Sequence, residues 1–234
     1  MAPTLVSAAV GALLAAALLG HAFDRRGVAV VVAAAVFPSL DAAASLVVPG
    51  ATNALLHAVW APVLVGGLLY WDTVRRPAGA STLRDRFGRR GVRVAWVALA
   101  SFVVAGIGSA LFAGEGAALL YPLEDARYVV RGRLVFSTRE GVVQTFLALG
   151  AEGPGVLPLE RAGGAVADPV ASWINPDGRP GLDPGAAREF RFVDGGWQLV
   201  IVAAAAATLA VRFRRRGGGG RGGESAATDG EVSR

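Results

Sequence analysis

The sequence predicts an all-α integral membrane protein with about five transmembrane helices and a long mixed extracytoplasmic segment between helices four and five. The chain has 234 residues, of which 53% are hydrophobic and 18% are charged, and its mean hydropathy is +0.49. This composition is too apolar for an ordinary soluble domain. Several apolar stretches come near the roughly 20 residues that a spanning helix needs. Arginine clusters follow three of these stretches, as expected for a chain that crosses a bilayer repeatedly.

The apolar stretches are expected to be the spanning helices. The first has no basic residue before it, and its arginines follow it. A cleaved signal peptide, which is the alternative, carries its positive charge before the apolar run, so an uncleaved first helix is expected. The last stretch is short and needs its flanking residues to cross the bilayer. The stretches cover about 5–22, 28–48, 53–71, 92–113 and 196–211.

The positions of the arginines predict the orientation. Arginines cluster at 25–26, 75–90 and 212–216, whereas the link VVPGAT at 47–52 carries no charge. In the long segment 114–195 the acids outnumber the arginines. The positive-inside rule places the clusters in the cytoplasm, so we expect a multi-pass protein of the cell membrane with its N-terminus outside and its C-terminus cytoplasmic. A pI near 10.8 would by itself suggest nucleic-acid binding. Because the arginines lie beside apolar stretches, no nucleic-acid partner is expected.

The chain divides into four parts. Residues 1–113 form a predicted four-helix transmembrane region, 114–195 an extracytoplasmic segment, 196–216 the fifth transmembrane helix and 217–234 a disordered cytoplasmic tail. The stretch RYVVRGRLVFSTREGVVQTFLAL in the second part has β-branched runs separated by glycines, which predicts a pair of short strands. The glycine-rich composition of the last part is typical of disorder.

Two polar residues stand out in the apolar stretch FPSLDAAASLVVPGATNALLHAVW. Asp41 is expected near the outer end of the second helix and His57 near the outer start of the third, so they can face each other. Such residues cost several kcal/mol in lipid unless they are paired or serve a function. One interpretation is a metal or acid–base pair that opens outward, and the other is a buried hydrogen bond that fixes two helices.

Two further features bear on this candidate site. His21 is expected at the inner end of the first helix, roughly 20 Å or more from His57 across the bilayer, so it is interpreted as an interfacial residue. Pro38 lacks a backbone N–H and is expected to interrupt the second helix just before Asp41. The chain has no cysteine, which excludes disulfides and thiolate metal ligands.

The segment FPSLDAAASLVVPGATNALLH resembles the membrane-bound metal-dependent hydrolase family (YdjM-like), in its archaeal form, and GEGAALLYPLEDARYVV resembles the part after that family's last motif. The family carries Leu-Pro-Asp-x-Asp, then His-Arg with a second histidine, then His-x-x-x-Asp. Asp41 matches the second acid, and His57 matches the second histidine. The remaining motif positions hold other residues, so the metal motif is degenerate: Ser39, Thr52, Asn53, Gly106 and Ala110.

The resemblance implies a membrane-embedded metal-dependent hydrolase with an incomplete metal site, in which Asp41 and His57 bind a divalent ion such as zinc or manganese. A hydrolytic metal needs about three protein ligands, and Glu115 or Glu124 could complete the set. The alternative is a non-catalytic membrane scaffold or interaction protein whose outer segment binds a lipid or protein partner. A small transporter subunit is a further alternative, with few ionisable groups for coupling. The expected partners are the lipid bilayer, another membrane protein or a second copy of the chain.

Overall fold

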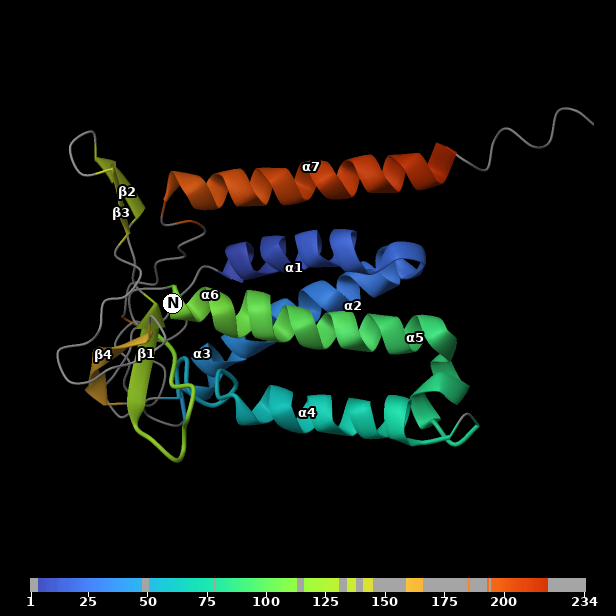
Figure 1. Ribbon diagram of the computed structural model, residues 1–234, viewed down its shortest axis with the longest axis horizontal. Helices are drawn as coiled ribbons and strands as arrows, with labels where there is room; N and C mark the ends of the chain where they lie inside the picture. The colour runs from blue at the N-terminus through green and yellow to red at the C-terminus, as the bar shows by residue number, and fades with distance from the viewer. Residues whose placement is uncertain are drawn as a thin grey trace, which may run out of the picture.

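The computed structural model describes residues 4–47, 51–77, 79–112, 116–130, 134–137, 141–144, 159–165, 185, 193 and 195–218. Within them the chain is mostly helical (Figure 1). The main helices are α1 (Thr4–Leu18), α2 (Arg25–Val36), α3 (Asp41–Ala44), α4 (Trp60–Tyr70), α5 (Thr82–Ser101), α6 (Gly108–Leu111) and α7 (Gly196–Gly218). Short 3₁₀ segments, η1 (Gly20–Ala22) and η2 (Phe37–Leu40), and π-helical segments, η3 (Trp71–Arg75) and η4 (Phe102–Ile107), join them.

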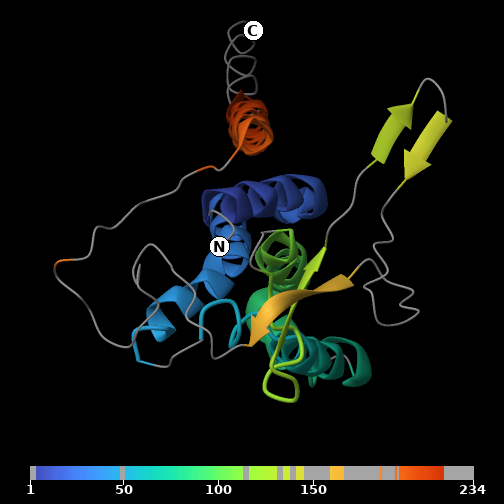
Figure 2. The same ribbon diagram turned by 90° about the vertical axis from the view of Figure 1, so that its left-hand side faces the viewer.

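The helices pack as a layered bundle. α1 packs against α2 on one side and α7 on the other, α2 packs against α5, and α4 packs against α5. Figures 1 and 2 both place α7 and α4 at opposite edges of the bundle. Among the described residues, three helices are long and apolar enough to cross a membrane: Arg25–Ala44, Thr82–Leu111 and Gly196–Arg216. The fold is therefore that of a helical protein suited to a membrane, as the composition predicts.

Small residues let the central helices approach closely. A Cβ atom at Gly11 of α1 would lie 2.6 Å from the Cβ of Ala35 and 3.0 Å from the Oγ of Ser101. No side chain fits at Gly11, so α1 approaches α2 and α5 with only the small side chains of Ala35 and Ser101 against it. A larger apolar cluster lies toward the end of the bundle where α1 turns into α2: Ala15, Ala16, Leu19, Ala22, Phe23, Val28, Val31 and Val97.

The arginine clusters lie at one end of this bundle. Arg93 of α5 donates to the carbonyl of Leu18 (2.9 Å), and Arg216 of α7 donates to the carbonyls of Gly20 (3.3 Å) and His21 (3.2 Å). Arg90 pairs with Asp24, whose carboxylate also accepts the backbone N–H of Gly27 in the first turn of α2 (2.7 Å). Helices far apart in the sequence therefore bring their basic residues together, at the right-hand end in Figure 1.

Asp72 organises the α4–α5 connection at the same end. Its carboxylate accepts the backbone N–H groups of Thr82 and Leu83, each at 3.0 Å, and the hydroxyl of Ser81 at 3.1 Å. Asp72, which follows α4, thus accepts backbone N–H groups at the start of α5 that have no partner within that helix.

The second and third predicted helices differ in their boundaries. The helical conformation narrows to 3₁₀ at η2, where Pro38 is buried, so the predicted interruption at this proline is confirmed. The expectation of a helix from residue 53 is wrong, because residues 51–59 form turns and α4 begins at Trp60. Asn53 has a positive φ of 58°, a left-handed conformation that a helix cannot continue through.

The fourth helix begins earlier than residue 92. α5 includes the arginine-rich residues from Thr82 onward, with a break at Gly88, where φ is 65° and ψ is −173°. Glycine adopts this conformation without a Cβ clash. The basic residues before the break therefore form a separate helical turn rather than a loop.

The strands lie beyond the other end of the bundle (Figure 1). β2 (Leu134–Ser137) and β3 (Gly141–Gln144) pair antiparallel, which confirms the predicted strand pair. β1 (Ala126–Val130) pairs antiparallel with β4 (Leu159–Ala165), a pairing that the sequence did not predict. Figure 2 shows the two pairs standing apart from each other. The predicted disordered tail lies outside the described residues, apart from its first two.

Candidate functional site

Asp41 and His57 are in contact. Asp41 begins α3 directly after η2, so the proline-containing turn sets the direction of its carboxylate. His57 comes from the turns between α3 and α4, not from a helix that faces Asp41. The distance between His57 Nδ1 and Asp41 Oδ2 is 2.9 Å. The expectation that the two side chains face each other is therefore confirmed, although His57 lies in a turn and not at the start of a helix.

The carboxylate of Asp41 is fully engaged by one short segment. Its exposed fraction is 0%, and that of His57 is 4%. The backbone N–H of Leu56 donates to both carboxylate oxygens, at 2.9 and 3.0 Å. An ionised carboxylate only accepts, so with Asp41 ionised the hydrogen of the third contact is assigned to Nδ1 of His57. A buried acid is tolerated when its lone pairs are used in this way.

The same turn binds residues 116–119, which follow α6 and lead toward β1. The side-chain amide of Asn53 donates to the carbonyl of Gly116 (3.2 Å), and the N–H of Ala118 donates to the carbonyl of Asn53 (3.0 Å). The N–H of Val59 donates to the carbonyl of Leu119 (2.9 Å). Asp41 therefore holds the turn at residues 53–59, and this turn holds the chain that leads into β1.

The loop and β1 are joined directly. Ala117 and Tyr128 exchange backbone hydrogen bonds of 2.8 Å in both directions. Gly116 has a positive φ of 69°, and a Cβ atom there would lie 2.4 Å from the carbonyl oxygen of Tyr128. The approach of this loop to β1 thus requires glycine at position 116.

The other positions of the resembled motif are closely packed. A Cβ atom at Gly106 would lie 2.6 Å from Cγ of Pro38 and 3.1 Å from the carbonyl oxygen of Ala35. Ala110 is 1% exposed. Thr52 is also buried, and its hydroxyl has no hydrogen-bond partner among the described residues. The two positions on the η4–α6 segment therefore serve helix packing.

The remaining sequence candidates lie elsewhere. His21 is in η1, at the arginine-rich end of the bundle, opposite the end where Asp41 and His57 lie. Glu124 accepts a hydrogen bond of 2.6 Å from the hydroxyl of Tyr128, and Glu115 lies outside the described residues. Within the part of the chain that the structure describes, no group of three or more histidine or acidic side chains is placed to hold a metal ion. The metal role of Asp41 and His57 stays a prediction.

Sequence reasoning missed the contribution of Leu56 and Asn53. Leu56 acts through its backbone N–H, for which no residue type gives a signal. Asparagine is enriched in left-handed turns, and the Pro-Gly pair just before it in VVPGATN would have favoured a turn there. Comparison of the chain with protein-family models, with curated proteins and with solved structures found no match.

Proposed function

We propose that this chain is a non-catalytic helical membrane protein in which the Asp41–His57 pair holds the extramembrane segment in place for binding a lipid or protein partner. The observation that carries this proposal is the carboxylate of Asp41, which is shared between His57 and the backbone of Leu56. Through Asn53 and Val59 the same turn is bonded to residues 116–119. The pair therefore connects a membrane helix to the chain outside it.

In this proposal the chain crosses the membrane five times. The crossings are α1, the α2–α3 unit, α4 with η3, the α5–α6 unit and α7, and their alternating directions in Figure 1 support this count. Large apolar side chains are exposed on α4, among them Val63 and Leu68 at 60% and 71%, which is compatible with lipid contact. The gathered arginines support a cytoplasmic location for that end, with the N-terminus outside.

The packing at Gly106 also favours a structural role. A histidine at this position would need room that Pro38 and the Ala35 carbonyl already occupy. The resemblance to metal-dependent hydrolases places a metal ligand there, and this chain instead uses the position to bring η4 against η2. In this proposal Gly106 and Ala110, which match ligand positions of the resembled motif, contribute to helix packing instead.

A metal-dependent hydrolase is the second candidate, and one observation favours it. Asp41 contacts Nδ1 of His57. Metal-binding histidines commonly donate the N–H of one ring nitrogen to a carboxylate, while the other ring nitrogen binds the ion. Zinc or manganese bound at Nε2 would lower the pKa of a bound water and so supply a nucleophile. His57 would then be the ligand, and Asp41 would orient it.

The two candidates are separated by comparing wild type with Asp41→Ala and His57→Ala in detergent. The structural proposal expects both variants to expose Arg127 of β1, which is 3% exposed in the folded chain, so trypsin should cleave after it faster. Metal content after incubation with zinc or manganese should not differ between the three proteins. The control is Ser39→Ala, because Ser39 is a half-buried neighbour whose hydroxyl makes no hydrogen bond to the residues that the structure describes. Stoichiometric metal that both variants lose would overturn the proposal in favour of the hydrolase.

A further inference from the structure

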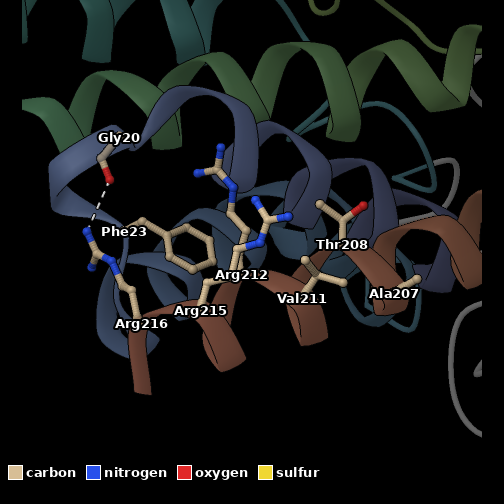
Figure 3. Close-up of a pocket in the computed structure, with 8 residues that line it drawn as sticks. All are labelled: Gly20, Phe23, Ala207, Thr208, Val211, Arg212, Arg215 and Arg216. Atoms are coloured by element: carbon tan, nitrogen blue, oxygen red, sulfur yellow. Dashed lines mark hydrogen bonds between the residues drawn. The ribbon is translucent and has the colours of Figure 1, made fainter. Parts of the chain in front are cut away.

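A cleft opens between the end of α7 and the turn after α1. Its volume is about 580 Å³. Figure 3 shows that the arginines of α7 gather on one side of the cleft around the ring of Phe23, with an apolar stretch of α7 beside them. The residues that line the cleft are Gly20, Phe23, Ala207, Thr208, Val211, Arg212, Arg215 and Arg216.

The cleft is strongly positive. Among the described residues no carboxylate pairs with Arg212, Arg215 or Arg216. The acid at the start of α2, Asp24, is engaged by Arg90. A group of guanidinium ions with no counter-charge among the described residues attracts an anion.

Two of the arginines are held in position by the fold. The guanidinium carbons of Arg212 and Arg216 lie 5.4 and 5.7 Å from the centre of the Phe23 ring, a cation–π arrangement. Arg216 also donates to the carbonyl of Gly20, the bond drawn in Figure 3. Arg215 is exposed and makes no hydrogen bond or ion pair with any other described residue. Phe23 itself is only 1% exposed, so it forms a rigid base for the cleft.

The rest of the cleft is apolar and points along α7. Ala207, Thr208 and Val211 precede the arginines at helical spacing, so they share a face with them. The segment Gly196–Arg216 is apolar enough to cross a membrane. In a bilayer, the arginines would lie at headgroup level and the apolar residues at the level of the acyl chain. This combination fits a lipid better than a free anion.

The geometry points to a binding site for an anionic phospholipid from the surrounding leaflet, with its phosphate on Arg212, Arg215 and Arg216 and its acyl chain along α7. Guanidinium groups recognise phosphate oxygens well because they present several donors in one plane. Among the main helices, α7 packs chiefly on α1, and only 11% of its most apolar window is buried. A lipid bound here would join α7 to η1 and strengthen its attachment to the bundle.

The test measures binding of a fluorescent phosphatidylglycerol to the full-length protein in detergent. Juxtamembrane arginines contribute about 5-fold each to binding of anionic lipid, so Arg215→Gln should weaken binding about 5-fold and Arg212→Gln/Arg215→Gln about 30-fold. Arg215→Lys keeps the charge and should stay within about 3-fold of wild type. Arg89→Gln is the matched control, because Arg89 is exposed and does not line the cleft. Since the Arg215 side chain is exposed and makes no hydrogen bond or ion pair within the described part of the chain, its variants should fold normally.

Two competition experiments identify the source of the phosphate. Unlabelled phosphatidylglycerol should displace the probe, whereas phosphatidylcholine should not. Inorganic phosphate at millimolar concentration should displace it weakly, because it lacks the acyl chain. If Arg89→Gln weakened binding of the labelled lipid as much as Arg215→Gln does, the effect would come from general surface charge, and the proposed site would be refuted. Displacement by inorganic phosphate as effective as that by the lipid would make it a free-phosphate site.

Discussion

The Asp41–His57 pair gives the sharpest test of the site. Asp41→Ala removes the acceptor for two donors, the part-buried N–H of Leu56 and the buried Nδ1–H of His57. Leaving a buried donor without a partner costs about 1–3 kcal/mol, and hydrogen bonds within membrane bundles lie toward the lower end of that range. We therefore expect Asp41→Ala to lower the free energy of unfolding by about 2–4 kcal/mol.

His57→Ala removes only one of these contacts. The carboxylate of Asp41 keeps the N–H of Leu56 and loses a charge-assisted partner, so a loss of about 1.5–3 kcal/mol is expected. The double variant should cost less than the sum, with a coupling energy of roughly 1–2 kcal/mol, because the contact can be lost only once. Ser39→Ala should change the stability by less than about 0.5 kcal/mol.

The assay is unfolding of the detergent-solubilised protein by denaturant, followed by tryptophan fluorescence, for the two single variants, the double variant and the control. Trp60 begins α4 directly after the turn that carries His57, so it reports on this region. Additive losses, with a coupling energy below about 0.3 kcal/mol, would show that the contact between the two side chains contributes nothing to stability. That result would refute the structural role of the pair.

Three further predictions concern single positions. Gly106→Ala should cost about 1–3 kcal/mol through overpacking, whereas Gly67→Ala, with open space around it, should stabilise α4 by about 0.5–1 kcal/mol; thermal unfolding measures both. The hydrogen bond with Arg90 holds the pKa of Asp24 below its ordinary value of 3.8. The stabilisation by the ionised Asp24 carboxylate is therefore present above pH 3.8 and is lost as the pH falls through the lowered pKa. Asp24→Asn should lose less of its free energy of unfolding at acid pH than wild type, which unfolding measured against pH tests. Thr52→Val removes a buried hydroxyl that has no partner among the described residues, so it should raise the unfolding midpoint. A lowered midpoint would reveal a hydrogen bond that the hydroxyl makes.

Local sequence pattern determined much of the helical architecture. The apolar stretches and the arginines after them are properties of neighbouring residues, and the structure places helices in each stretch with the arginines at one end. The break at Pro38 follows from its missing N–H, which acts wherever the residue stands. The β2–β3 pair is likewise local, because a short connection brings the two strands together.

Tertiary structure decided what the apolar pattern left open. Residues 53–59 are apolar enough for a helix, yet they form turns whose hydrogen-bond partners are Asp41 on one side and residues 116–119 on the other. The pairing of β1 with β4 also joins segments far apart in the chain. The arginine cleft exists only because α7 lies against the turn after α1. Hydropathy and helical periodicity record what a residue and its neighbours prefer, whereas these features depend on which distant groups meet, and folding alone decides that.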